Sequence, residues 1–411
     1  MTTNVVRKPS LKACFLLGNV AHGCGGHSRS LKTTVEALQR KIECTVIDIG
    51  FRPSPVIAST KVKSYHVYYN GLNLWSAFRR IGRIIAEEEA DVLHVFNSNV
   101  FFLARLMSIA CHKPLLLTKC GGPSPRKYFP CADQIVVYHM QDLDYFTSHS
   151  KFRDSQIHFI PNRVTRAQSN PSRIAGLRSR LRAGGKTFLR IARFAPEYLP
   201  SMMQSINLVN RLNREGHACQ LALIGAPQEP QVLEEVARRE NENIRVFYGE
   251  EFTVDAHELI DAAEFVIGTG RGFMEAASRG RVLLTPLCEE NLPLLVTEET
   301  FHRVFATNFS PRNRVDDYDE EANYRAIVRA LKDPSFTREL CRQSIDYFER
   351  YFNIDHVIDK HERIARSAHL AKKLRPADLA LSAYLSLRAY VPRCIRAGGV
   401  FGQRVGRMAP T

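Results

Sequence analysis

Val-Ile-Gly-Thr-Gly-Arg-Gly-Phe-Met-Glu-Ala-Ala-Ser-Arg-Gly-Arg-Val-Leu-Leu occupies residues 266–284, and this stretch decides the fold. Its apolar start is typical of the end of a buried strand, and glycines then stand at 268, 270 and 272. Residues 273–279 are expected to form a helix that Gly280 ends, with a further strand over 282–284. The sequence therefore predicts a strand, a glycine loop and a helix in succession.

A glycine loop that opens a helix is a natural anion site, because unpaired N–H groups and the positive end of the helix dipole both face it. An ordinary strand–turn–helix is the alternative, in which Glu275 favours the dipole and pairs with Arg271 four residues earlier. The rest of the chain decides between the two. The residues concerned are Gly268, Thr269, Gly270, Arg271, Gly272 and Glu275.

The composition is that of a large chain with two hydrophobic cores. The chain has 411 residues, of which 45% are hydrophobic, and this is enough for two domains. No apolar run reaches the length of a membrane span, and no signal peptide is evident. The ten cysteines are scattered, without zinc-ligand spacing, which favours reduced thiols and a cytoplasmic location. We expect no metal and no cofactor.

The positive charge is concentrated at the end of the chain. Of the net charge of +15, the segment 360–411 carries +9, from eleven Lys and Arg against two acids. Such a tail can serve an anionic membrane, a nucleic acid or solubility alone. Residues 378–391 are predicted to form an amphipathic helix, attached to a membrane surface or docked or frayed at the terminus. No stacking-aromatic or helix-turn-helix pattern supports nucleic-acid binding.

The first 160 residues alternate between strands and helices, which predicts a doubly wound parallel sheet. Ligands gather at the carboxyl ends of such strands, where Gly25, Gly26, Asn97 and Gly121 fall. The first loop does not keep the G-x-G-x-x-G spacing, and Asp48 lies within its strand, so a nicotinamide or flavin site is disfavoured. The predicted strands are 12–17, 44–49, 91–96, 114–118, 135–138 and 156–160, with helices over 29–40, 76–89 and 101–110.

A polar connection over 161–185 precedes a second alternation of the same kind. Its strands are predicted at 188–192, 219–224 and 244–248, before the glycine-loop stretch, and helices follow over 319–368. Arg193 and Gly225 stand at strand ends. Two doubly wound domains joined in this way place a ligand cleft between them.

Taken together, these residues resemble the GT-B glycosyltransferases, and within them the retaining group 1, or family 4, enzymes. The resemblance covers roughly residues 11–365. It is carried by Gly25-Gly26, Asp-Val-Leu-His-Val-Phe-Asn from 91, Thr-Lys-Cys-Gly-Gly-Pro from 118, Phe-Ile-Pro-Asn-Arg-Val from 159, Arg-Ile-Ala-Arg from 190, Leu-Ile-Gly from 223 and Glu-Ala-Ala-Ser-Arg-Gly from 275.

The resemblance implies an N-terminal acceptor domain over 1–163 and a C-terminal nucleotide-sugar domain over 164–345. A helix over 346–370 would cross back to the first domain, and a basic tail would follow over 371–411. Arg193 would face the donor diphosphate, Glu275 the ribose, and the Gly268–Gly272 backbone the phosphates. Gly25, Gly26 and Gly225 are assigned to the donor, and Asn97, Cys120, Gly121 and Gly122 to the acceptor.

Three positions depart from the family pattern. The first of the two usual glutamates is Ile267, the usual lysine after the donor arginine is absent, and the loop that often carries a histidine reads Lys-Cys-Gly-Gly from 119. Lys119 is assigned a share in the diphosphate role, so that Glu275, Arg193 and Lys119 form the predicted catalytic set. His94, inside an apolar strand, is interpreted as a core residue.

Two D-x-D patterns, Asp142/Asp144 and Asp317/Asp319, are rejected as metal motifs, because both lie at predicted helix starts, where Asp caps helices. The sequence thus predicts a glycosyltransferase that moves a sugar from a nucleotide-sugar to a glycan or lipid-linked acceptor. Bacterial surface polysaccharide assembly, retention of configuration and peripheral contact with the inner membrane are further expectations. The alternative is a catalytically silent GT-B protein that binds a nucleotide or a partner.

Overall fold

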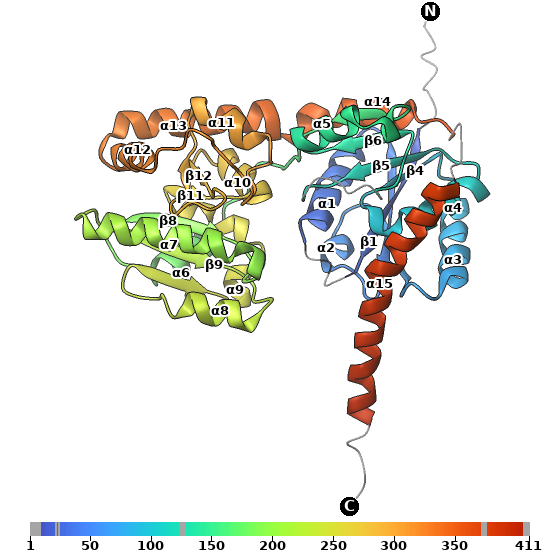
Figure 1. Cartoon of the computed structure of the whole chain (residues 1–411), viewed down its shortest axis with the longest axis horizontal. Coiled ribbons are helices and arrows are strands. Elements are labelled where there is room, and N and C mark those ends of the chain that lie inside the picture. The colour runs from blue at the N-terminus through green and yellow to red at the C-terminus, as the bar shows by residue number, and fades with distance from the viewer. Residues whose placement is uncertain (1–9, 21–22, 24, 123–128, 371–375, 406–411) are drawn as a thin grey trace, which may run out of the picture. The chain divides into compact units, whose positions relative to one another are not determined.

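The computed structural model describes residues 10–20, 23, 25–122, 129–370 and 376–405. The chain divides into two compact units (Figure 1). Unit 1 comprises Met1–Ile160 and Ile354–Thr411, and unit 2 comprises Pro161–Asn353. The sequence placed the first division at 163 and the return to the first domain from 346 onward. The predicted cleft between the domains stays a prediction.

Unit 1 is built on a seven-stranded parallel sheet in the order β3-β2-β1-β4-β5-β6-β7. Both faces of the sheet are buried, as is typical of a parallel sheet covered by helices, and this explains the nearly continuous apolar runs in the sequence. The strand β3 was not predicted. The strands are β1 Lys12–Asn19, β2 Glu43–Gly50, β3 Lys63–Tyr68, β4 Val92–Val95, β5 Leu115–Lys119, β6 Gln134–Val137 and β7 Gln156–Phe159.

Alternate residues of β1 point into two separate cores of unit 1. Phe15 packs with residues of α1, α2 and α14, whereas Leu16 packs with residues of α3, α4 and α15. Helices therefore cover both faces of the sheet (Figure 1). The helices are α1 Gly26–Leu38, α2 Pro55–Ala58, α3 Leu74–Glu87, α4 Phe101–Ala110, α5 Met140–Ser148, α14 Ile358–Arg366 and α15 Pro376–Val405, with short turns at η1 Ser98–Val100, η2 Ser150–Phe152 and η6 Ile354–Val357.

Unit 2 repeats this architecture with the strand order β10-β9-β8-β11-β12-β13. All neighbours are parallel except β13, which runs antiparallel to β12. The predicted polar connection over 161–185 belongs to unit 2. The strands are β8 Lys186–Ile191, β9 Cys219–Ile224, β10 Ile244–Phe247, β11 Phe265–Ile267, β12 Val282–Thr285 and β13 Leu294–Leu295.

The sheet of unit 2 also separates two cores. Phe188 of β8 packs with α7, α8 and α12, and Leu189 packs with α6, η4, α10 and α11. The helices are α6 Pro171–Arg178, α7 Leu199–Arg214, α8 Pro230–Ala237, α9 Glu250–Thr253, α10 Gly270–Ser278, α11 Glu298–Phe305, α12 Glu320–Lys332 and α13 Pro334–Tyr347, with turns at η3 Pro196–Tyr198, η4 Ala256–Ala262 and η5 Phe348–Phe352. The predicted class of two doubly wound α/β domains is confirmed.

The two units share a close backbone contact at the carboxyl end of their second strands, β2 and β9. A Cβ added to Gly50 would lie 1.8 Å from the Asn19 carbonyl oxygen, and one added to Gly225 would lie 1.8 Å from that of Ala192. The chain leaving the first strand therefore passes directly over the second strand in both units. Only glycine fits there.

Candidate functional site

The strand order of unit 2 reverses between β8 and β11, because β9 lies on one side of β8 and β12 lies beyond β11. Such a reversal opens a crevice at the carboxyl ends of the two central strands, which is where open α/β sheets bind ligands. The chain leaves β8 into Arg193 and leaves β11 into the glycine loop and α10. Of the predicted donor residues, Arg193 and those from Gly268 to Glu275 thus lie at the switch point of this sheet.

Each glycine of the loop has a distinct reason to be glycine. The Gly268 N–H donates to the Leu284 carbonyl, and a Cβ there would lie 2.6 Å from Phe273 Cα, so this position is fixed by packing. Gly270 has φ +48°, in the left-handed region that glycine favours. Gly272 has no atom within 4 Å of an added Cβ, so the start of α10 is open on that side. Thr269 is the residue that precedes the helix, which begins three residues earlier than predicted.

Arg190 is the functional candidate that sequence reasoning missed. Its side chain is only 1% exposed and lies at the base of the loop, where it donates to the Ile267 carbonyl at 3.2 Å and approaches Thr269 Oγ1 at 3.5 Å. A third bond goes to Ser201 Oγ at 2.9 Å. All of these partners are neutral.

The charge of Arg190 has no carboxylate partner among the described residues. Burial lowers the pKa of its guanidinium to about 10, so the group is still charged at neutral pH. Its Nε is buried without a hydrogen-bond partner in the described part of the chain. A buried cation without a counterion costs several kcal/mol, which an anion bound at the adjacent helix start would offset.

Arg193 follows the carboxyl end of β8, beyond Arg190, and is more exposed than Arg190. Its side chain is 42% exposed, donates to Tyr198 Oη at 2.9 Å and lies 3.7 Å from a Glu197 carboxylate oxygen. Its guanidinium carbon is also 5.2 Å from the Tyr198 ring centroid. These contacts orient a cation at the end of β8 while leaving part of it accessible.

Glu275 lies in α10 and is held by the arginine one turn before it. Arg271 donates to Glu275 Oε1 at 3.2 Å, and both side chains are largely buried. Arg271 also donates to the Arg163 carbonyl at 3.1 Å. The pairing that the sequence offered as the alternative interpretation is present, and it fixes the Glu275 carboxylate in the second turn of the helix, because α10 begins at Gly270.

Gly225, assigned to the donor from the sequence, has a structural task. Its N–H donates to the Phe247 carbonyl at 3.0 Å, so it continues the sheet and does not point to a ligand. The close approach of the Ala192 carbonyl accounts for the glycine.

We expect Gly225→Ala to destabilise unit 2 by about 3 kcal/mol, because the added methyl overlaps a backbone carbonyl that cannot move without opening β8. Gly26→Ala is the matched control, since nothing lies within 4 Å of a Cβ there. Urea unfolding followed by circular dichroism measures both variants. Equal stability of Gly225→Ala and wild type would contradict the overlap.

Unit 1 has its own switch point between β1 and β4, and Gly25 and Gly26 lie there. Gly25 precedes α1, and its carbonyl accepts from the Arg29 N–H at 3.2 Å. Among the described residues, nothing lies within 4 Å of a Cβ added to either glycine, so these residues leave room for a ligand at this helix start. Of the two histidines that flank the loop, His27 is exposed and His22 lies outside the described residues.

Asn97, predicted to contact the acceptor, holds the end of β1 in the structure. Its Nδ2 donates to the Gly18 carbonyl at 2.7 Å, and its Oδ1 accepts from the Gly18 N–H at 3.2 Å. The side chain is buried. Both ends of the amide are therefore committed to β1, and its acceptor role stays a prediction.

Lys119, whose role toward a diphosphate stays a prediction, is paired inside unit 1. Its Nζ lies 3.3 Å from Asp142 Oδ2 and donates to the carbonyls of Cys120 at 3.0 Å and Gly121 at 3.3 Å. Asp142 is fully buried, and His139 Nε2 lies 3.1 Å from the same oxygen. The ammonium thus fixes the course of the loop after β5.

His139 completes this cluster through both nitrogens of its ring. The Asp142 N–H donates to His139 Nδ1 at 3.2 Å, which places the ring proton on Nε2. Nε2 then faces Asp142 Oδ2 and the Gly122 carbonyl, the latter at 3.2 Å. Lys119, His139 and Asp142 thus form a buried polar network that contacts the backbone of the predicted acceptor loop.

The loop residues themselves divide between core and surface. Cys120 packs in the core, its Sγ lies 3.0 Å from the Phe96 carbonyl, and burial raises the pKa of its thiol to about 12. The Cys120 side chain therefore has a packing role, and the contact of this residue with an acceptor stays a prediction. Gly121 is half-buried, and Gly122 is exposed and has φ +102°. Pro123 lies outside the described residues.

Three further expectations concern buried side chains. His94 is a core residue, with Nε2 2.7 Å from Thr118 Oγ1 and a pKa that burial lowers to about 3. Ile267 is fully buried in a core cluster, so the position of the usual first glutamate points away from the crevice. Asp142 is buried whereas Asp144 is exposed, and Asp319 caps α12, so neither D-x-D pattern forms a shared site.

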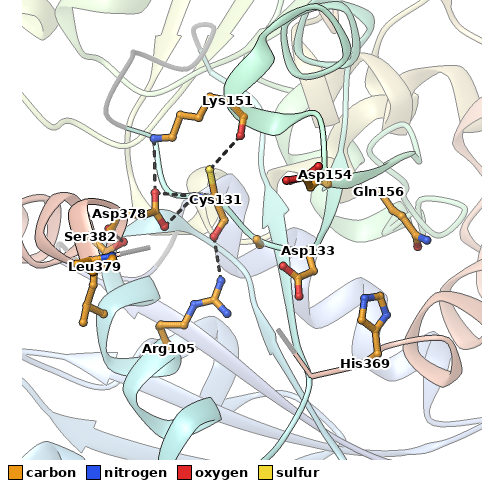
Figure 2. A pocket seen from close by; sticks show the side chains of 13 residues that line it. Arg105, Cys131, Asp133, Lys151, Asp154, Gln156, His369, Asp378, Leu379 and Ser382 are labelled. Carbon is orange, nitrogen blue, oxygen red and sulfur yellow. Dashed lines mark hydrogen bonds and ion pairs between the residues drawn. The ribbon is translucent and has the colours of Figure 1, made fainter. Parts of the chain in front are cut away.

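A cavity of about 530 Å³ lies in unit 1 at the opposite edge of the sheet, beside the first residues of β6 and β7 (Figure 2). Part of its polar lining is mutually paired: Asp378 of α15 accepts from the Cys131 N–H at 2.9 Å and lies 3.5 Å from Lys151 Nζ. Arg105 donates to the Cys131 carbonyl at 2.9 Å. These contacts anchor the start of α15.

Within the described residues, no group of three or more His, Cys, Asp and Glu side chains is arranged to hold a metal ion. In the same part of the chain, no helix is both long and apolar enough to span a bilayer.

No protein-family model matches the chain, and no curated protein matches it in sequence. Solved structures match its fold over most of its length. HepE from Anabaena, in complex with UDP and glucose, is 13% identical, with a TM-score of 0.62 over 87% of this chain and 100% of HepE. A glycosyltransferase from Rickettsia africae is 12% identical, with a TM-score of 0.67 over 87% of this chain and 98% of that one.

Sucrose-phosphate synthase from Thermosynechococcus elongatus is also similar, at 15% identity and a TM-score of 0.56, over 86% of this chain and 98% of the synthase. The chain has the GT-B fold, as predicted. Membership of the retaining family 4 stays a prediction.

Proposed function

We propose that the chain is a glycosyltransferase that moves a sugar from a nucleotide-sugar donor to a glycan or lipid-linked acceptor. The observation that carries this proposal is Arg190, a buried cation without a described carboxylate partner, directly below the start of α10 at the switch point of unit 2. Similar structures that contain UDP support a nucleotide as the anion.

The arrangement suits the chemistry of glycosyl transfer. Negative charge develops on the departing nucleoside diphosphate as the bond to the sugar breaks. Preorganised N–H dipoles and cations stabilise such charge without reorganising during the reaction. In this proposal the buried Arg190 supplies a fixed positive charge beneath the glycine loop. Arg193, at the end of β8, binds the diphosphate, and the start of α10 supplies N–H groups.

Glu275 is proposed to accept hydrogen bonds from the ribose hydroxyls, oriented by Arg271. Gly25 and Gly26 of unit 1, with open space at their helix start, are proposed to approach the donor or acceptor. Lys119 is proposed to shape the loop from Cys120 to Gly122, on which the acceptor assignment rests.

We further propose a place in bacterial surface polysaccharide assembly, retention of configuration, no metal requirement, and peripheral contact with the cytoplasmic face of the membrane through the basic tail. Segment 376–392 of that tail packs against unit 1 through Asp378 and Tyr390. A truncation that tests the tail should therefore remove only 393–411.

A catalytically silent GT-B protein is the second candidate, and Ile267 favours it. Because Ile267 faces the core, Glu275 is the carboxylate that α10 contributes to the crevice, and it is already paired with Arg271. Such a protein would bind a nucleotide without consuming a nucleotide-sugar.

A thermal-shift screen with UDP, GDP, ADP, CMP and TDP tests the proposal. One nucleotide is expected to stabilise wild type, and Glu275→Ala is expected to weaken its binding about 10- to 100-fold, because a hydrogen bond to a charged group is lost. Glu339→Ala, an exposed carboxylate in α13, is the matched control. Consumption of the matching nucleotide-sugar then separates an enzyme from a silent protein, and no shift with any nucleotide would contradict both.

A further inference from the structure

The docked part of α15 has an inverted distribution of polar and apolar side chains. Ser382, Ser386 and Tyr390 are almost completely buried against unit 1, whereas Tyr384 is 51% exposed and Leu387 is 46% exposed. Tyr390 donates to the Ile49 carbonyl at 2.9 Å, and Ser386 Oγ lies 3.1 Å from Tyr69 Oη. The helix therefore presents two serines and Tyr390 to unit 1, while Tyr384 and Leu387 face outward.

A second apolar feature adjoins this helix. Leu72, in the turn between β3 and α3, is 67% exposed, and Trp75, in the first turn of α3, is 71% exposed. The turn touches α15, because a Cβ added to Gly71 would lie 3.0 Å from Tyr390 Cβ. Trp75 is the single tryptophan of the chain. A large aromatic side chain left in water beside an exposed leucine is the feature that needs an explanation.

Positive charge extends from the same turn along α3. Trp75, Arg79 and Arg83 are spaced four residues apart and so lie along one stripe of the helix. Both arginines are exposed, and neither has an ion pair in the described residues. The helix has three arginines against the single acid Glu87 at its end.

We propose that this surface binds an anionic lipid bilayer, with Trp75 and Leu72 in the interfacial layer. We define the Trp75 surface as Leu72, Trp75, Arg79, Arg83, Tyr384 and Leu387. Charge complementarity favours a bilayer as the partner. The exposed arginines match anionic lipid headgroups, and the exposed aromatic and aliphatic side chains beside them match the apolar layer beneath those headgroups. Aromatic side chains of this kind favour the membrane–water boundary.

The Trp75 surface lies at the same edge of the sheet as the glycine loop of unit 1. Trp75 follows the carboxyl end of β3, and α15 packs on η1, which follows the carboxyl end of β4. This is the sheet edge where Gly25 and Gly26 lie. A bilayer bound there would bring a lipid-linked acceptor to this edge, a consequence that rests on the proposed function, whereas bilayer binding itself does not.

Trp75 reports on its own insertion, because it is the sole tryptophan. The full chain is titrated with phosphatidylglycerol/phosphatidylcholine vesicles and with pure phosphatidylcholine vesicles while tryptophan emission is recorded. We expect a shift to shorter wavelength with the anionic vesicles, quenching by brominated acyl chains, and reversal in high salt because the charges are screened. No shift with anionic vesicles would overturn the proposal.

Two variants that retain Trp75 test the two halves of the surface. Arg79→Gln/Arg83→Gln is expected to weaken vesicle binding about 25-fold, at about fivefold for each arginine. Leu72→Asp is expected to abolish the emission shift, and Tyr248→Asp, at another exposed hydrophobic site, in unit 2, is the matched control. Full binding by Leu72→Asp, or a salt-independent shift with neutral vesicles, would contradict the assignment.

Two outcomes would assign the effect to a different contact, either the basic tail or a second copy of the chain. If truncation after Pro392 abolishes binding while Leu72→Asp does not, the tail alone is the contact and the proposal is wrong. If wild type forms a dimer that Leu72→Asp dissociates, the surface belongs to a second copy and the proposal is wrong. Nucleotide thermal shifts on the same variants are expected to equal those of wild type, so a failure of the proposed function is scored separately.

Discussion

Arg190→Met is expected to weaken binding of the stabilising nucleotide about a hundredfold, because a buried unit charge about 6 Å from a phosphate contributes roughly 3 kcal/mol at an effective dielectric constant near 20. Methionine keeps most of the apolar volume and removes the charge. In the unliganded protein, loss of three hydrogen bonds is offset by relief from burying an unpaired cation. Thermal unfolding with and without the nucleotide measures both effects.

Arg105→Met is the matched control, since Arg105 is also a buried arginine whose pKa burial lowers. Asp133 and Asp378 act on its charge, and it lies in unit 1 on the cavity of Figure 2. We expect this variant to be less stable and to retain the nucleotide-induced shift. If Arg190→Met kept the full shift, Arg190 would be a structural tie between β8, β11 and α7, and the observation behind the proposed function would be lost.

The sequence contained a signal for Arg190 that its interpretation passed over. In Lys-Thr-Phe-Leu-Arg-Ile, an arginine stands within an apolar strand and three residues before the arginine chosen as the donor contact. A charge inside a buried strand needs a partner, and no local carboxylate is available in that run. The same reasoning that classified His94 as a core residue could have singled it out.

The alternation of strands and helices was predictable because parallel strands covered on both faces leave long apolar runs. The direction in which side chains point at the strand ends could not be predicted in the same way. Thr118 and Cys120 share one face of β5 and its extension, and this parity turns Cys120 into the core. Asn97 and Lys119 have the chemistry of ligand contacts, but their partners Gly18 and Asp142 are distant in the sequence.

The local sequence pattern of α15 also does not predict which side of this helix packs against unit 1. Its sequence is amphipathic, yet serines face the protein and Tyr384 and Leu387 face outward. The contact depends on Tyr69, more than 300 residues earlier, whose hydroxyl meets Ser386. An amphipathic pattern indicates that a helix has two faces, and only tertiary partners decide which face is inside.

Lys119→Met is expected to lower the free energy of unfolding by about 3–5 kcal/mol, because it leaves the Asp142 carboxylate buried without its cation. The fully buried Asp142 also approaches His139, so loss of the ammonium disturbs the network under the loop from Cys120 to Gly122. Urea unfolding followed by circular dichroism measures the change. Lys61→Met, an exposed lysine in the same unit, is expected to change stability by less than about 0.5 kcal/mol.

The double variant Lys119→Met/Asp142→Leu separates a buried ion pair from a ligand contact. Replacing both charges with apolar groups of similar volume is expected to recover most of the lost stability, since the cost arises from the unpaired charge. If Lys119 instead faced the donor diphosphate, as the sequence suggested, Lys119→Met alone would leave stability unchanged and reduce nucleotide affinity. The 3.3 Å contact between Lys119 Nζ and Asp142 Oδ2 favours the first result, because an ammonium already neutralised by a buried carboxylate has little charge to offer a phosphate.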